Sequence, residues 1–360
     1  MDYAKISINE LGFDKFFESN LKELEVEKYT IARVIAEYKE AYRVISNNGE
    51  FLAKITGKQI FNATKREDYP AVGDWILITE LNDNKAIIHQ ILPRKTLLEK
   101  KYSNKQENQL IATNIDTAFI IESVDRDFNL NRFERYLIIS RKANIIPVFI
   151  LNKIDLISKT EINNLFSQVK SRFNKVEVIL TSTKTEAGIN NLIKYIKKGQ
   201  TYCFLGSSGV GKSSLVNALL GKNIIKTQEI NTTNERGRHT TSVRELYLLK
   251  NGGIVIDNPG TREVGISDSY SGIENVYNEI TDLSRNCKFS NCTHTNEPEC
   301  AILAAIANNL LDINKFDNYL KLKKESEYFE MNKREKRLKD RKFGIYVKKY
   351  FDNLNKEPHI

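Results

Sequence analysis

The 360-residue sequence predicts a multidomain protein with a small β-barrel first, a parallel α/β domain in the middle and a mainly helical segment last. Five short strand-like runs within residues 29–92 predict the barrel. From about residue 110, strand-like and helix-like segments alternate, which is typical of a parallel sheet covered by helices on both faces. Three of the four cysteines lie within residues 287–300, in the helical segment. They indicate a metal site there.

Residues 1–26 predict an amphipathic helical preface, in which apolar residues alternate with charged ones: Ile8, Leu11, Phe16, Leu21 and Leu24. The strands of the barrel are expected at Tyr29–Ile35, Ala41–Ile45, Glu50–Ile55, Val72–Glu80 and Lys85–Leu92. Five strands of this length fit an OB-fold, a barrel that binds nucleic acids. The spacing alone also fits an SH3-like barrel or a purely structural one.

A phosphate-binding loop is the most specific motif in the α/β part. Gly-x-x-x-x-Gly-Lys-Ser spans residues 206–213, between an expected strand at Thr201–Leu205 and an expected helix at 213–220. Backbone N–H groups and the positive end of the helix would surround the phosphates. Lys212 would reach the β- and γ-phosphates, and the Ser213 hydroxyl would bind Mg²⁺. The predicted nucleotide contacts here are Gly206, Ser207, Ser208, Gly209, Val210, Gly211, Lys212, Ser213 and Ser214. The alternative is a glycine-rich turn before a core helix.

A guanine-reading loop is predicted at Asn152, Lys153 and Asp155, because this Asn-Lys-x-Asp motif follows the apolar run 146–151. The Asp155 carboxylate can accept hydrogen bonds from N1–H and N2–H₂ of guanine, and adenine has no such pair of donors. A second base-contacting loop is expected after the strand Val176–Leu180. By position it holds Ser182, Thr183 and Lys184.

The γ-phosphate side of the site is expected in two later segments. Asp257 ends an apolar strand and would hold Mg²⁺ through a water molecule, and Gly260 would offer its backbone N–H to the γ-phosphate. The polar stretch 231–241 resembles a switch loop, in which Thr240 or Thr241 would contact Mg²⁺. No glutamine follows Gly260, so His239 is the candidate to orient or deprotonate the attacking water.

The order of these motifs is unusual, because the guanine-reading loop precedes the phosphate loop. An ordinary small GTPase begins with the phosphate loop and carries the base-reading loop near its end. The sequence therefore predicts a circularly permuted GTPase domain that uses GTP with Mg²⁺.

The cysteine cluster has the form Cys-x₄-Cys-x-His-x₅-Cys and comprises Cys287, Cys292, His294 and Cys300. Three cysteines cannot all pair with one another, so metal binding is favoured over disulfides. A Cys₃His set suits tetrahedral Zn²⁺. Since four protein ligands leave no position for water, one structural zinc ion per chain is expected.

The chain carries a formal net charge of +9, and residues 321–349 hold 12 Lys and Arg against 5 Asp and Glu. This basic segment is either a solvated helix face or an RNA-binding surface. Because a zinc module and an OB-fold are also expected, RNA binding is favoured. The opening stretch is mixed in charge and has no apolar h-region, and no segment approaches the length of a membrane span. We expect a soluble, cytoplasmic protein.

With these motifs in this order, the sequence resembles the RsgA family of circularly permuted GTPases over nearly its whole length. The resemblance rests on the nucleotide and zinc motifs and on Pro70–Trp75, Asn114–Asp116, Arg236–Thr241 and Ala301–Leu322. It implies an OB-fold at residues 27–95, a permuted GTPase domain at 110–268 and a zinc-binding, basic helical domain at 275–360.

The resemblance also implies a function: late maturation of the small (30S) ribosomal subunit. Such a protein binds the subunit and its 16S rRNA in the GTP state, near the decoding region, and leaves after subunit-stimulated hydrolysis to GDP. The proposed catalytic histidine of the family corresponds to His239, and a monomer is expected. The sequence departs from the family at Thr183, Ser242, Asn258 and Thr261, none of which is a zinc ligand.

Two other functions fit the residues. One is a GTP-gated factor that binds a different RNA, which only the identity of the partner would distinguish. The other is a GTP-binding scaffold without hydrolysis, which the missing glutamine makes conceivable. ATP hydrolysis fits less well because of Asp155.

Overall fold

The computed structural model describes residues 6–21, 28–101, 108–125, 128–222, 225, 244–257 and 270–331, with scattered positions up to residue 345. The chain forms two compact units, Met1–Gly265 and Ile266–Ile360, and each is described here by itself. The finer domain boundaries within the first unit stay predictions. His239, Thr240, Thr241 and Gly260 lie outside the described residues, as does most of the basic segment after residue 331.

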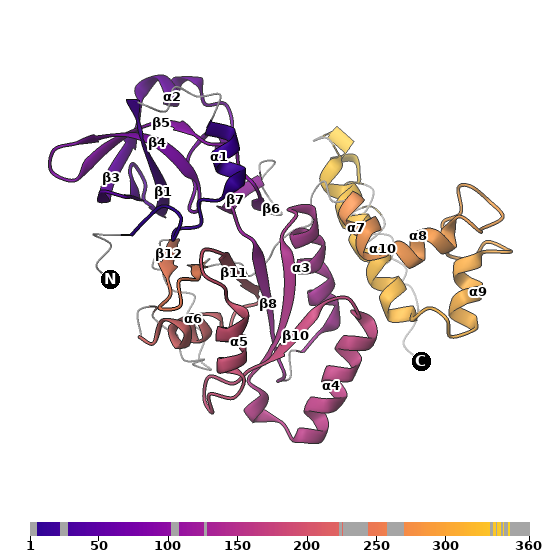
Figure 1. Cartoon of the computed structure of the whole chain (residues 1–360). Helices are drawn as coiled ribbons and strands as arrows, with labels where there is room; N and C mark the ends of the chain where they lie inside the picture. The colour runs from indigo at the N-terminus through magenta and orange to yellow at the C-terminus, as the bar shows by residue number, and fades with distance from the viewer. Residues whose placement is uncertain are drawn as a thin grey trace. The chain divides into compact units, whose positions relative to one another are not determined.

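The first unit begins with a closed barrel of five strands (Figure 1). These are β1 (Thr30–Glu37), β2 (Tyr42–Ser46), β3 (Gly49–Ile55), β4 (Trp75–Leu81) and β5 (Lys85–Ile91). The order is β1-β2-β3-β5-β4, and β4 closes the barrel by pairing with β1, with Ala32 opposite Ile76. β3 and β5 are parallel, and the short helix α2 (Gly57–Asn62) follows β3. This is the OB-fold topology, so the predicted barrel type is confirmed.

The segment before the barrel is described over residues 6–21 of the predicted helical range 1–26. Within these residues α1 (Lys15–Leu21) is the helix, and residues 8–12 form turns instead. The side chains that this segment buries are Leu11, Phe13 and Phe17, whereas Phe16 is exposed. Phe13 packs edge-on against Trp75 with ring centroids 4.8 Å apart. The segment therefore covers one side of the barrel core. Gly12 has a φ of +88°, which favours glycine and permits the turn that precedes α1.

The second part of the first unit is a six-stranded α/β sheet. Its strands are β8 (Thr117–Ser123), β9 (Ile146–Asn152), β10 (Glu177–Leu180), β11 (Thr201–Gly206), β12 (Glu245–Leu248) and β13 (Ile254–Asp257). Their order is β10-β9-β8-β11-β13-β12, and only β12 is antiparallel to its neighbour. β11, which leads into the phosphate loop, lies between β8 and β13 although it comes fourth along the chain. The strands have the arrangement of a P-loop GTPase sheet, but their order along the chain is circularly permuted.

Helices cover both faces of this sheet, as the alternating sequence pattern predicts (Figure 1). α3 (Leu130–Lys142) and α4 (Lys159–Arg172) lie on one face, and α5 (Ile189–Tyr195) and α6 (Lys212–Leu220) lie on the other. Strands with helices on both faces are buried throughout, and all seven residues of β8 are buried. This explains why the central strands are continuous apolar runs in the sequence.

Two elements that were not predicted join the barrel to the α/β sheet. The hairpin of β6 (Leu97–Lys101) and β7 (Asn108–Thr113) connects the two parts along the chain. β12 pairs with β1 of the barrel at Ala36 and Glu245, so the barrel and the α/β strands form one continuous sheet. A salt bridge of 2.9 Å between Arg43 of β2 and Glu245 supports this joint.

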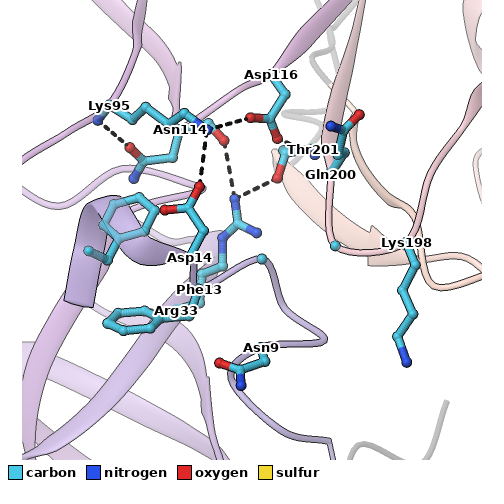
Figure 2. A pocket seen from close by; sticks show the side chains of 13 residues that line it. Asn9, Phe13, Asp14, Arg33, Lys95, Asn114, Asp116, Lys198, Gln200 and Thr201 are labelled. Atoms are coloured by element: carbon cyan, nitrogen blue, oxygen red, sulfur yellow. Dashed lines mark hydrogen bonds and ion pairs between the residues drawn. The ribbon is translucent and has the colours of Figure 1, made fainter. Parts of the chain in front are cut away.

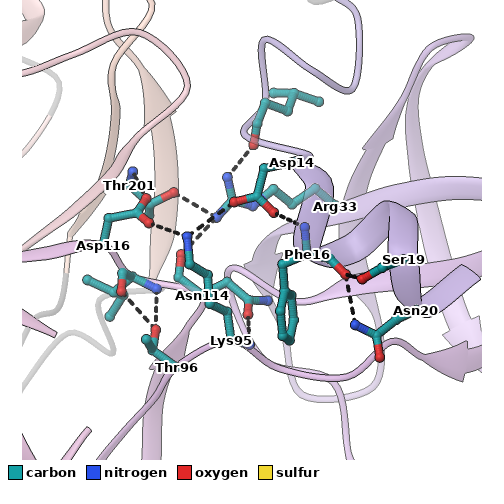
Figure 3. Close-up of polar contacts among 12 residues, drawn as sticks. Asp14, Phe16, Ser19, Asn20, Arg33, Lys95, Thr96, Asn114, Asp116 and Thr201 are labelled. Atoms are coloured by element: carbon teal, nitrogen blue, oxygen red, sulfur yellow. Dashed lines mark hydrogen bonds and ion pairs between the residues drawn. The ribbon is translucent and has the colours of Figure 1, made fainter. Parts of the chain in front are cut away.

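A buried arginine also links the two parts, at the amino-terminal end of β11. The Arg33 side chain is buried and donates to Leu11 O, Gly73 O, Asn114 O and Thr201 Oγ1, the last at 2.9 Å. Figure 2 shows the bonds to Asn114 and Thr201. Lys95 pairs nearby with Asp14 and Asp116 at 3.1 and 2.9 Å (Figure 3). A cavity of about 300 Å³ lies beside these groups. We call this set of contacts around Arg33 the Arg33 junction.

The second unit is helical, as predicted, with α7 (Tyr270–Val276), α8 (Asn278–Ser284), α9 (Ala301–Ala307) and α10 (Ile313–Glu330). Tyr277 is fully buried, stacks edge-on with Tyr319 at 5.4 Å between ring centroids and accepts a hydrogen bond from Asn318. Across the part of the chain that the structure describes, no helix combines the length and apolar character needed to cross a membrane.

Candidate functional site

The phosphate loop follows the carboxyl end of β11 and leads into α6, as expected for a phosphate-binding helix N-terminus. Two of its glycines are required by close approach. A Cβ at Gly206 would lie 2.4 Å from Ile121 O, and one at Gly211 would lie 2.3 Å from the Asn152 side chain. Gly211 also has φ of +97°. The loop therefore fits tightly against β8 and the guanine-reading loop.

Lys212, the first residue of α6, reaches back across the loop. Its Nζ donates to Gly206 O at 2.8 Å and to Ser207 O at 2.6 Å. The ammonium group therefore lies over the turn that would surround the phosphates, and its contact with them stays a prediction. Ser213 and Ser214 occupy the next two positions of the same first helical turn.

Asn152 ties the two predicted loops together. Its side-chain amide donates to Val210 O at 2.8 Å, and its carbonyl oxygen accepts from Thr181 Oγ1 at 2.9 Å. The residue is fully buried. Its position fits a scaffolding role that holds the phosphate loop against the base-reading loops, which the motif alone did not reveal because the bond to Val210 spans 58 residues.

The predicted base-reading residues lie together at the carboxyl ends of β9 and β10. Ser182 Oγ donates to Asp155 Oδ1 at 2.6 Å, and the same Ser182 oxygen accepts from the backbone N–H groups of Lys184 and Thr185. Thr183 lies between Ser182 and Lys184 in the sequence. Two loops that were separate in the sequence are thus one hydrogen-bonded unit, which holds the Asp155 carboxylate in place. Lys153 adopts a left-handed backbone and pairs with Asp125 at 3.0 Å.

Hard oxygen ligands suited to Mg²⁺ lie in the first turn of α6 and at the end of β13. Ser213 is the second residue of α6, and Asp257 ends β13. Burial raises the pKa of Asp257 to about 6, with Lys212 opposing the shift and Glu245 adding to it. Burial disfavours the charged form of Asp257, and a bound cation would stabilise that form. Ser213 and Asp257 are therefore suitable ligands for Mg²⁺.

One acidic residue beside the loop was missed. Glu122 is buried near the end of β8, where it accepts from Arg132 of α3 at 3.1 Å. The signal in the sequence was a charged residue at the end of a continuous apolar strand, because such a residue needs a partner when both faces of the sheet are covered.

The four predicted metal ligands converge in the second unit. The ligand atoms of Cys287, Cys292, His294 and Cys300 all lie within 4.8 Å of one another. His294 Nδ1 is 3.6 Å from Cys287 Sγ and 3.5 Å from Cys300 Sγ, and the two sulfurs are 3.9 Å apart. Bond lengths of about 2.1 and 2.3 Å to a tetrahedral zinc ion imply separations of roughly 3.5–3.8 Å between ligand atoms. The cluster can hold a metal ion, and its geometry fits zinc.

Comparison with known proteins agrees with this geometry. The family model described as RsgA GTPase matches residues 91–267. The small ribosomal subunit biogenesis GTPase RsgA 2 of Lactiplantibacillus plantarum is 40% identical over 305 residues, which are 85% of this chain and 86% of the relative. The RsgA 1 protein of Bacteroides thetaiotaomicron is 37% identical over 345 residues, 94% of this chain and 96% of the relative.

Among solved structures, YjeQ from Thermotoga maritima aligns with a TM-score of 0.61 and 25% identity, covering 82% of this chain and 97% of that one. YloQ, described as a circularly permuted GTPase, aligns with a TM-score of 0.60 over 86% of this chain and 98% of that one; at 22% identity it supports the fold alone. The identity to curated relatives extends over most of both chains. The chain therefore belongs to the RsgA family of GTPases.

Proposed function

We propose that this protein hydrolyses GTP during biogenesis of the small ribosomal subunit. In this proposal it binds the 30S subunit and its 16S rRNA in the GTP state and leaves after subunit-stimulated hydrolysis. The observation that supports it most is the union of phosphate loop and base-reading loops through Asn152, in a chain 40% identical to a small ribosomal subunit biogenesis GTPase.

The nucleotide contacts in the proposal are those of the two loops. Lys212 and the backbone of residues 206–214 hold the phosphates, and Asp155, oriented by Ser182, selects guanine. Ser213 and Asp257 hold Mg²⁺, which neutralises phosphate charge when bound. Thr240 or Thr241 and Gly260 complete the γ-phosphate side, and His239 orients the attacking water.

The partner surface in the proposal combines the OB-fold at residues 27–95 with the basic helical domain at 275–360. A barrel of this topology and a segment with 12 Lys and Arg against 5 Asp and Glu both suit an RNA backbone. One zinc ion per chain, held by Cys287, Cys292, His294 and Cys300, keeps that domain folded. The protein would act as a monomer in the cytoplasm, where ribosomal subunits mature.

GTP turnover by the purified protein, alone and with 30S subunits, 50S subunits or 70S ribosomes, tests the proposal. We expect strong stimulation by 30S subunits only, and loss of turnover in Lys212→Ala. Turnover that no ribosomal particle stimulates would point to another RNA partner, and GTP binding without turnover under any condition would favour a scaffold. Metal analysis is a separate check: one zinc per chain is expected in the wild type and in the control Cys203→Ala, and none in Cys292→Ala.

A further inference from the structure

Glu122 lies directly beneath the phosphate loop. In the parallel pairing of β8 with β11, Ile121 is opposite Gly206, so Glu122 lies beside the first turn of the loop at Ser207. Its side chain has no solvent exposure. A carboxylate in this position lies next to the loop that binds the nucleotide phosphates.

Only one of its two oxygens is paired. Oε2 accepts from Arg132 Nη1 at 3.1 Å, whereas Oε1 is buried and has no hydrogen-bond partner among the residues that the structure describes. An unpaired buried carboxylate oxygen costs on the order of 1–3 kcal/mol or more. Protonating that oxygen removes the charge, so the neutral acid is unusually favourable here.

Three neighbouring elements place charged or polar groups around Glu122. α3 provides Arg132 and, one turn later, Tyr136, whose hydroxyl hydrogen-bonds to the Ser207 side chain. The phosphate loop provides Lys212, and the segment after β8 provides Asp125. Burial raises the pKa of Glu122 to about 7, Arg132 and Lys212 oppose the rise, and Asp125 adds to it. Both protonation states are therefore populated near neutral pH.

We propose that Glu122 is a positioning residue that couples nucleotide binding to the uptake of one proton. The inference rests on the proposed function, since it concerns the same phosphate site. As a carboxylate, Glu122 attracts the Lys212 ammonium and repels the phosphates. When the phosphates bind, Lys212 turns to them and Glu122 takes a proton from solvent onto its unpaired oxygen, which removes the repulsion.

The sign of the pH dependence follows directly. Negative phosphates raise the pKa of Glu122 above its value of about 7 in the free protein. Nucleotide binding then takes up a proton between the free and bound pKa values, and affinity falls as the pH rises through that window. A rise of one unit would change the dissociation constant by about tenfold across the window.

Calorimetric titration with GDP and Mg²⁺ in buffers of different ionisation enthalpy measures proton uptake directly. We expect uptake of a fraction of a proton at pH 7.5 in the wild type, and about sixfold weaker binding at pH 8.5 than at pH 6.5 for a one-unit rise in the pKa. In Glu122→Gln, which keeps the shape and an acceptor for Arg132, uptake should fall to the level due to GDP itself and affinity should become nearly independent of pH.

Glu134→Gln is the matched control. Glu134 is also a fully buried carboxylate, and it pairs with an arginine of another helix, Arg172 of α4, at 2.8 Å. It should bind GDP with the pH dependence of the wild type. Equal proton uptake in the wild type and in Glu122→Gln would overturn the inference, as would wild-type binding without pH dependence, which needs no variant. No binding of guanine nucleotide at all would overturn the proposed function as well.

Discussion

The two ends of strand β11 differ in how their polar groups are satisfied. At Thr201, the Arg33 junction is complete within the protein: Arg33 is bound by three backbone carbonyls and a hydroxyl, and Asp116 accepts from Thr201 N and pairs with Lys95. At Gly206, five residues later, Lys212 binds carbonyls of its own loop, and Glu122 Oε1 has no hydrogen-bond partner among the residues that the structure describes. The polar groups at the Thr201 end find their partners within the protein, whereas those at the Gly206 end would be stabilised by a bound ligand.

This difference has electrostatic consequences. Burial lowers the pKa of Arg33 to about 10, although Asp116, Asp74 and Asp14 oppose the shift, so the guanidinium stays charged at neutral pH. At the Gly206 end, burial raises the pKa of Glu122 to about 7 and that of Asp257 to about 6. Perturbed groups close to neutral pH are typical of binding sites, whereas the Arg33 junction has the character of a structural joint.

Lys212→Ala should have the largest effect on function. Removing the lysine assigned to the β- and γ-phosphates should lower kcat/KM for GTP by roughly 10²–10³-fold. Thermal stability should change little, because the carbonyls to which Lys212 donates belong to its own loop. Lys198→Ala is the control: it removes an exposed lysine that pairs with Glu10 near the Thr201 end. Equal losses of kcat/KM in the two variants would contradict the view that only the Gly206 end of β11 takes part in nucleotide binding.

Arg33→Met should affect stability instead. It leaves buried acceptors of Leu11, Gly73 and Thr201 without their donor, which should lower the free energy of unfolding by about 3 kcal/mol. The urea midpoint of the first unit measures this loss. GDP affinity of the folded protein should stay within a factor of two or so of the wild type. A large loss of GDP affinity with unchanged stability would assign the junction to the nucleotide site.

Asp155→Asn tests whether this residue selects guanine at the nucleotide site. Loss of a charged acceptor for guanine should weaken GTP binding by about 2 kcal/mol, roughly 30-fold, while ATP binding stays as weak as before. Competition between labelled GTP and unlabelled ATP measures the discrimination. Asp125→Asn changes a neighbouring carboxylate that pairs with Lys153 and should leave base choice intact.

Arg43→Ala should have the smallest effect. Arg43 and Glu245 join the barrel to β12, but their side chains are 27% and 24% exposed. Pairs with this access to water contribute about 0.2–1 kcal/mol, well below the loss expected for buried Arg33. Chemical denaturation of the two arginine variants side by side tests this ranking, and a larger loss for Arg43→Ala would reverse it.

Much of this architecture could be predicted from local sequence patterns. Apolar runs located β8, β9, β11 and β13, and the loops at their ends carried motifs with fixed spacing. The five barrel strands were predicted within about three residues of their ends because turn residues separate them. Local patterns could not give contacts across long separations: Arg33 to Thr201 spans 168 residues, and Asn152 to Val210 spans 58.

The missed elements have a common cause. β12 has only four residues, and its pairing with β1 of the barrel depends on the assembled sheet rather than on its own sequence. In the segment before the barrel, Gly12 and the contact of Phe13 with Trp75 end the apolar periodicity that suggested a longer helix. Glu122 was overlooked because its importance comes from neighbours on α3 and in the phosphate loop.

Hydrogen exchange with and without GDP and Mg²⁺ tests the contrast between the two ends most directly. We expect nucleotide to slow exchange at residues 206–214, 152–155 and 181–184, and to leave residues 114–116 and the Thr201 end of β11 unchanged. Protection that is equal at both ends, or that is confined to the Arg33 junction, would contradict the account.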